Sequence, residues 1–396
     1  MSLGIILFIV AILVVVMIHE AGHLIVAKVF GFKATKFFVG FGPPLWSFTK
    51  GETEYGIAAI PAGGFVKIVG MNPYEEVAPE DEPRSYPNKP AWQRALVLVA
   101  GSATHWVVAF VILVITTMTI GFPTNQGTNE VALVEGRIEG DLAPAAEAGL
   151  KPGDVIVEID GRETQNWNDT RAAIRATEPG ETMQLVVERD GERMELSARL
   201  GTAVFSEEGE LLEYAPPGEE VSSDVPSGAE TVGFLGVQPE PEFKTEGPIG
   251  AMSTSGGIVV DVTARSFRGI GEVFTMVFGG ELWDALQGEG ERQVDEGPLG
   301  LVGAGRIAGE SVQSGQFLNF VGLIVGFTIF VGLMNLLPLP PLDGGHLAVL
   351  AWEKVTGKKV DIRKLIPVAA AVIGFFVILF VAVLYLDLAR PVKMPF

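Results

Sequence analysis

The stretch VVVMIHEAGHLIVAKVF at residues 14–30 places His19, Glu20 and His23 in a run that otherwise reads as a membrane helix. An ionisable group near a bilayer centre is costly, so such residues are rare and usually functional. The two histidines are four residues apart and share one helix face, with the glutamate beside them. HExxH on a helix is typical of zinc peptidases, in which the histidines hold the metal and the glutamate activates water. We therefore expect a zinc site in this helix.

Four apolar stretches are long enough to cross a bilayer, which takes about 20 residues. They cover residues 3–27, 94–121, 317–337 and 365–388. The first lacks the basic start and the small-residue cleavage site of a signal peptide, so we expect it to stay in the membrane. The pattern predicts an α-helical, multi-pass membrane protein.

Basic residues close to the membrane ends predict the orientation. The loop of residues 28–94 holds eight Lys and Arg, and the loop of residues 338–364 holds five. Such loops face the cytoplasm, so residues 122–316 and both termini are expected outside the cytoplasmic membrane. Arg390 and Lys393 argue against an outer C-terminus, but two loops outweigh one tail.

The net charge and the lack of cysteine limit which partners and which zinc ligands the chain can have. Residues 122–316 hold 36 of the 48 acidic residues in a chain of net charge −20, which indicates a solvated acidic surface and argues against a nucleic-acid partner. With no cysteine, zinc must be bound by His, Asp or Glu, and histidine occurs only at positions 19, 23, 105 and 346.

The chain divides into four regions. Residues 1–121 hold two spans, with a β-hairpin and loop region at 32–71 between them. Residues 122–245 read as an extracytoplasmic α+β module, in which the acidic segment 201–231 is expected to be an irregular insertion. Residues 246–316 form a linker with an amphipathic helix at 265–287, which lies on the outer leaflet or packs against the module. Residues 317–396 hold the last two spans.

The module contains AGLKPGDVIVEIDG at residues 148–161, which resembles the core of PDZ domains in bacterial proteases. The pattern predicts a helix at 167–177, strands near 182–189 and 193–200, and a closing strand in GFLGVQPE at 233–240. A PDZ-like groove would bind an extended peptide by strand addition.

A third zinc ligand is expected from NLLPLPPLDGGH at residues 335–346, where three prolines break the third span. Irregular backbone at membrane depth is tolerated only where it is buried or lines a wet cavity, so Asp343 is a candidate ligand. Asp343 as a turn or cap residue, and His346 as a ligand or as a residue that orients one, are the alternatives. His105 in the second span is expected to be a packing histidine.

A distance estimate supports the pairing of the two motifs. His19 lies about 24 Å along the first helix at about 1.5 Å per residue, near the inner edge of a hydrocarbon core about 30 Å thick. The third span runs inward to the proline cluster, so both motifs reach the cytoplasmic side.

HEAGH, GFGPP, PAGGFVKI and NLLPLPPLDGGH, in this order, resemble the site-2 protease family of intramembrane zinc metalloproteases, of the bacterial type with one PDZ domain. The resemblance implies that His19, His23 and Asp343 bind Zn²⁺ and that Glu20 is the catalytic base. It implies that Asn335 contacts substrate or the developing oxyanion, with a structural cap of the broken helix as the alternative. Strands around Gly40 and Gly42 would clamp the substrate.

The same resemblance implies regulated intramembrane proteolysis of single-span membrane proteins, such as anti-sigma factors already trimmed by another protease. The chain departs from the family at AGSATH, residues 100–105, where relatives often carry a proline and an asparagine. A non-catalytic adaptor that acts through the PDZ-like module and a metal transporter are the alternatives from other classes.

Overall fold

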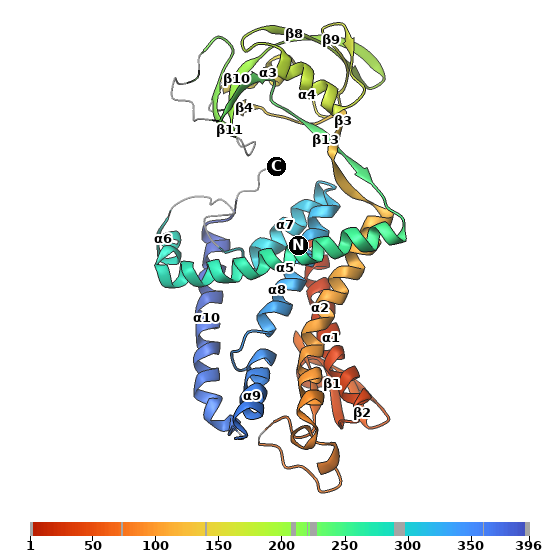
Figure 1. Cartoon of the computed structure of the whole chain (residues 1–396), viewed down its shortest axis with the longest axis vertical. Helices are drawn as coiled ribbons and strands as arrows, with labels where there is room; N and C mark the ends of the chain where they lie inside the picture. The colour runs from red at the N-terminus through yellow and green to blue at the C-terminus, as the bar shows by residue number, and fades with distance from the viewer. Residues whose placement is uncertain are drawn as a thin grey trace. The chain divides into compact units, whose positions relative to one another are not determined.

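The computed structural model describes residues 3–72, 74–138, 141–206, 211–219, 221, 228–288, 298–358 and 360–392. Two compact units make up the chain (Figure 1). One combines Met1–Ile115 with Pro248–Phe396, and the other is Thr116–Gly247.

Four helices of the first unit are long and apolar enough to cross a membrane, which confirms the four predicted spans. They are α1 (Leu3–Val29), α2 (Ala91–Thr119), α8 (Phe317–Asn335) and α10 (Ile366–Ala389), the last extended by the turn from Arg363. None of the most apolar window of α10 is buried, and a helix that is apolar all round suits contact with lipid. The chain is therefore a multi-pass membrane protein.

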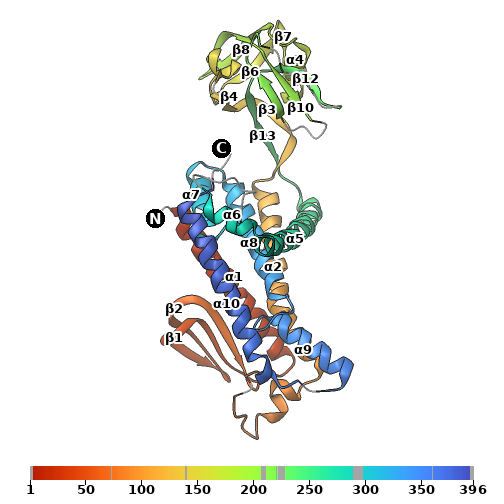
Figure 2. The ribbon, with the colours of Figure 1, turned by 90° about the vertical axis from the view of Figure 1, so that its left-hand side faces the viewer.

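The expected β-hairpin follows α1. Strands β1 (Ala34–Lys50) and β2 (Thr53–Ile68) pair in antiparallel fashion, and Figure 2 shows them beside the lower part of α1. Buried Phe32 and Ile68 join Leu24 and Ala27 of α1 in one apolar cluster, which fixes the base of the hairpin to the helix. The segment between the hairpin and α2 contains two short 3-10 helices, Glu82–Arg84 and Tyr86–Asn88.

The linker differs from the expected single helix at 265–287. Helix α5 begins earlier, at Pro248, and ends at Gly279, and α6 (Glu281–Gln287) follows after Gly280, whose φ of 94° favours glycine. Phe274 and Phe278 of α5 stack on Phe375 of α10. Helix α5 therefore packs among the membrane helices, and its place at the outer leaflet stays a prediction.

Helix α7 (Leu301–Gln313) was not expected from the sequence. It packs against α1, α8 and α10, and a Cβ on Gly4 of α1 would lie 2.6 Å from the Ala308 carbonyl oxygen. The buried Asp387 carboxylate of α10 accepts the N–H groups of Gly300 (3.2 Å) and Gly303 (2.8 Å) at the start of α7. The buried residues of this helix are mainly glycine and alanine, which let the neighbouring helices approach it closely.

The second unit is built on a sheet in the order β13-β3-β6-β8-β9, with β7 (Arg162–Glu163) paired to β6. Its strands are β3 (Phe122–Val134), β6 (Val155–Ile159), β8 (Thr182–Arg189), β9 (Glu192–Arg199) and β13 (Val237–Lys244). Helices α3 (Pro144–Glu147) and α4 (Trp167–Ala176) and the two-stranded pair β4 (Arg137–Ile138) and β5 (Asp141–Leu142) complete it. The helix predicted at 167–177 and the strands predicted near 182–189 and 193–200 are present within a residue of those bounds.

Residues 201–231 correct one expectation. Their described part is not irregular, because β10 (Gly201–Phe205) pairs with β11 (Leu211–Ala215) and with β12 (Glu230–Phe234) in a three-stranded sheet. The expected closing strand at 233–240 is divided between β12 and β13, which belong to different sheets. Residues 207–210, 220 and 222–227 lie outside the described residues.

A buried ion pair ties β8 to the loop before β6. The Asp154 carboxylate, 1% exposed, lies 2.6 Å from Nε of Arg189 and accepts the Lys151 N–H at 2.8 Å. Burial alone would raise the pKa of Asp154, but the hydrogen bonds from Arg189 and Lys151 outweigh it, so this pKa lies below its ordinary value. A lowered folded pKa stabilises the fold above the unfolded pKa of about 3.9 and ceases to do so as the pH falls through the folded value.

Asp154→Asn should therefore destabilise the second unit at pH 7, because a neutral amide makes weaker hydrogen bonds with Arg189 than the carboxylate does. It should also remove part of the loss of stability below about pH 4. Hydrogen exchange of residues 182–199 in the full chain measures both effects. Asp190→Asn, an exposed neighbour with the same change of side chain, is the control. Equal exchange in the two variants would contradict a stabilising role for the pair.

Candidate metal centre

Helix α1 presents three side chains of the HExxH motif at its lower end. His19 and His23 are 7% and 6% exposed, and their Nε2 atoms lie 3.2 Å apart. A Cβ on Gly22 would lie 2.6 Å from the Ala100 carbonyl oxygen, so a glycine at this position lets α2 approach α1 closely. The buried imidazoles are therefore enclosed on one side by α2.

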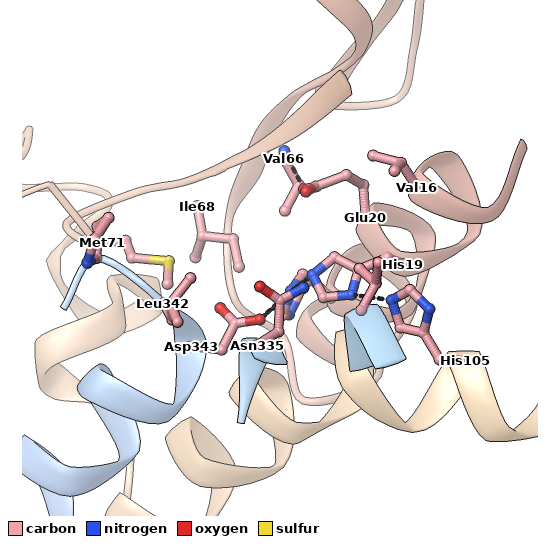
Figure 3. A pocket seen from close by; sticks show the side chains of 13 residues that line it. Val16, His19, Glu20, Val66, Ile68, Met71, His105, Asn335, Leu342 and Asp343 are labelled. Atoms are coloured by element: carbon pink, nitrogen blue, oxygen red, sulfur yellow. Dashed lines mark hydrogen bonds and ion pairs between the residues drawn. The ribbon is translucent and has the colours of Figure 1, made fainter. Parts of the chain in front are cut away.

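Asp343 comes from the break after α8. That helix ends at Asn335, residues 336–342 are non-helical, and Asp343 is the first residue of α9 (Asp343–Thr356). A Cβ on Gly345 would lie 2.6 Å from the Pro340 backbone nitrogen, so the tight turn into α9 requires a glycine there. The expected break at the prolines is present, and it directs the Asp343 side chain towards α1 (Figure 3).

The three side chains meet at one point. Oδ2 of Asp343 lies 3.3 Å from Nε2 of His19 and 3.3 Å from Nε2 of His23. One potential ligand atom from each residue falls within 4.8 Å of the other two, and within the described part of the chain this is the only such group found. Two imidazoles and one carboxylate, with a position left open, are a donor set that catalytic zinc uses. The residues therefore fit a zinc ion.

Residues of α2 contact both imidazoles at their Nδ1 atoms. Nδ1 of His23 donates to the Val97 carbonyl oxygen at 2.7 Å, and Nδ1 of His19 lies 3.0 Å from Nε2 of His105. In each ring, Nδ1 therefore contacts a residue of α2, and Nε2 faces Asp343. Ligating histidines usually hold their second nitrogen in this way.

Glu20 lies at the edge of the same cavity, held by the hairpin. Its Oε2 accepts the Val66 N–H of β2 at 3.0 Å, and Figure 3 shows the carboxylate directed at that strand. A Cβ on Gly64 would lie 3.4 Å from Cγ of Glu20 and 2.9 Å from the Phe38 carbonyl oxygen, so the strand passes very near the helix. The hairpin therefore sets the direction of the expected base.

A cavity of about 290 Å³ connects these groups. Asn335, at the end of α8, lines it together with Glu20 and the three candidate ligands. The cavity has room for water beside the candidate ligands. Its walls also include Val16, Val66, Ile68, Met71, His105, Val331, Pro341 and Leu342.

Two other features considered in the sequence analysis lie outside this cavity. Gly40 and Gly42 do not line the cavity; both have positive φ (83° and 90°) and bend β1, and the strand nearest the site is β2. His346 lines a separate cavity with Arg94 and Glu353 and is not one of the three clustered donors. The structure thus brings together Asp343 and the HExxH residues, and leaves His346 outside.

His105 was expected to be a packing residue, yet it contacts His19 directly. One signal in the sequence could have located it. His105 is a polar residue in an apolar span, four positions after Gly101. A Cβ on Gly101 would lie 2.5 Å from Cε1 of His23 and 2.8 Å from Cε1 of His19, so α2 touches the imidazoles at the glycine and one turn later at the histidine.

Comparisons with known proteins agree with this site. The family model of Peptidase family M50 matches residues 7–381. The chain is similar to the zinc metalloprotease Rip1 of Mycolicibacterium smegmatis, with 34% identity over 89% of this chain and 86% of the relative. It is also similar to the zinc metalloprotease Rip1 of Mycobacterium tuberculosis, with 32% identity over 99% of this chain and 98% of the relative.

Among solved structures, the PDZ domain of an SdrC-like protein from Listeria innocua matches with 22% identity and a TM-score of 0.17. The match covers 24% of this chain and 97% of that domain. A likeness at this TM-score supports no structural argument, so the PDZ-like assignment of residues 122–245 stays a prediction.

Proposed function

Because the chain belongs to peptidase family M50, the site-2 protease family of zinc metalloproteases, we propose that it cleaves single-span membrane proteins within or near their transmembrane segment. It is a zinc metalloendopeptidase with Zn²⁺ as its cofactor, and the adaptor and transporter alternatives therefore fall. The observation that supports the proposal most directly is the meeting of His19, His23 and Asp343 at 3.3 Å, beside Glu20.

In this proposal the chain's own residues have distinct roles. His19 and His23 bind zinc through Nε2, and Asp343 binds it through a carboxylate oxygen. Zinc, when bound, acts as a Lewis acid towards water and towards a peptide carbonyl. Glu20 takes a proton from water and passes it to the leaving amine. The Val66 N–H holds one oxygen of Glu20, so the carboxylate stays at the cavity wall.

The substrate would bind in an extended form along β2. A transmembrane helix has its backbone groups hydrogen-bonded internally, so its scissile bond is accessible only after local unwinding. The Val66 N–H points away from β1 and towards Glu20, which supports an edge of β2 that faces the cavity. Pairing with that edge would stabilise an unwound segment next to the metal. We propose that β2 is the strand that clamps the substrate. Gly40 and Gly42 would then only shape β1, its partner strand.

We place the site near the cytoplasmic face. The basic loops on either side of the hairpin and after the proline break support this orientation. Residues 122–245 would then lie outside as a PDZ-like domain that binds a peptide or a substrate terminus. Trimmed anti-sigma factors are the substrate class that we propose for regulated intramembrane proteolysis by this chain.

Comparative proteomics of membranes tests the function. Cells that express Glu20→Gln in place of the wild type should accumulate single-span proteins, and purified wild-type enzyme should then cleave these proteins near their membrane segment. Accumulation of soluble proteins only, or cleavage of the candidates outside the membrane region, would contradict the proposed substrate class.

Asn335→Leu distinguishes the two roles considered for Asn335. If the amide donates to the developing oxyanion, kcat should fall by about 10²–10³-fold, with KM and zinc content nearly unchanged. If Asn335 only ends α8, the variant should melt at a lower temperature while kcat per folded molecule stays the same. We expect the first result, measured on a substrate recovered by the proteomics, with Asn319→Leu at the other end of α8 as the control.

A further inference from the structure

Three imidazoles form a row at the metal centre. His105 is 1% exposed in α2, and its Nε2 lies 3.0 Å from Nδ1 of His19. Nε2 of His19 in turn faces Asp343 and His23 (Figure 3). The two candidate ligand rings therefore differ in their support, because His23 is held by a backbone carbonyl and His19 by a side chain.

The position of the ring proton on His19 determines the hydrogen-bonding role of His105. A zinc ligand offers the lone pair of Nε2, so the single proton of a neutral His19 sits on Nδ1 and needs an acceptor. The atom within hydrogen-bond distance is Nε2 of His105, which can accept only in a neutral ring with its own proton on Nδ1. We propose that neutral His105 is a positioning residue that accepts the Nδ1–H of His19 and fixes the tautomer and direction of this zinc ligand.

His105 is itself held between two helices. A Cβ on Gly332 of α8 would lie 2.8 Å from Cβ of His105 and 3.1 Å from its Cγ, so α8 packs directly on the histidine. The same helix leads into the turn before Asp343, so α8 contacts His105 and also positions the segment that supplies the third candidate ligand. The arrangement links α1, α2 and α8 at the metal centre.

The second nitrogen of His105 gives independent support. Nδ1 is buried, and the backbone carbonyl of Thr328 in α8 interacts with the His105 ring. A proton on Nδ1 has this carbonyl as an acceptor, which favours the tautomer whose Nε2 accepts the Nδ1–H of His19.

The inference rests on the proposed ligand role of His19, and the affinity of the purified full chain for Zn²⁺ tests it. His105→Phe keeps a ring but has no nitrogen, and should weaken zinc binding by about 10–100-fold. His105→Gln should bind zinc much more tightly than His105→Phe, because its amide oxygen reaches as far as Nε2 and can accept the same N–H. His346→Gln, in the separate cavity, is the control and should match the wild type.

Binding is measured by competition with a zinc chelator, and Co²⁺ absorption reports the geometry of the ligands. Wild-type affinity in His105→Phe, or equal affinity in the Phe and Gln variants, would overturn the inference. If His105→Phe does not fold, His105→Gln decides: a Co²⁺ spectrum close to that of the wild type is expected, and loss of metal binding overturns the inference. His19→Ala, measured in parallel, separates the two proposals, since unchanged affinity there would refute the ligand assignment itself.

Discussion

Glu20→Gln should lower kcat/KM by about 10²–10⁴-fold, the range that general acid–base catalysis contributes. The amide has the same size and can still accept the Val66 N–H through its oxygen, so the side chain should keep its place. It cannot take a proton from water. Zinc content should remain at the wild-type level, because Glu20 is not one of the clustered donors.

The measurement compares turnover and bound zinc in the same preparation. Glu54→Gln changes a carboxylate of β2 that accepts a hydrogen bond from Ser47 outside the cavity, and it should leave turnover unchanged. Near-normal turnover by Glu20→Gln would remove Glu20 from the mechanism. Loss of zinc together with turnover would instead indicate that Glu20 supports the metal.

Gly101→Val should abolish zinc binding and, with it, all activity. A Cβ at position 101 would already lie 2.5 Å from Cε1 of His23 and 2.8 Å from Cε1 of His19, and the additional methyl groups of valine cannot be accommodated without moving both rings. Such contacts are shorter than packed atoms tolerate, so helix α2 must shift or the imidazoles must leave their positions. Either movement separates the Nε2 atoms from Asp343.

Ala103→Val is the matched control, because residue 103 lies on the exposed face of the same helix. Zinc content, chelator competition and thermal unfolding are measured for both variants. A Gly101→Val protein that binds zinc like the wild type would show that the close approach of α2 is not needed. A folded protein without zinc is the expected result, and it would assign the glycine to the metal centre.

Much of the architecture could be predicted from local patterns. The four spans follow from continuous apolar length, and the strands and helices of residues 144–200 follow from alternation and turn residues. Helix α7 was missed although Ala304, Ile307, Ala308 and Ser311 follow helical spacing, because its three glycines lower the helix propensity of the segment. The strands at 201–231 could not be predicted, since an acidic composition conceals pairing that depends on partners distant in sequence.

For the candidate site too, some features could be predicted from the sequence and others could not. HExxH and the proline-broken segment identify His19, His23, Glu20 and Asp343 in the sequence, because ionisable groups are too costly in a membrane helix to be there without a use. The sequence by itself therefore indicated the candidate residues of the site and the segments that supply them. The contacts of His105, Gly101 and Val66 with those residues were decided only by the tertiary structure. Each of them depends on how closely two elements distant in sequence approach, and no local pattern of residue types records that distance.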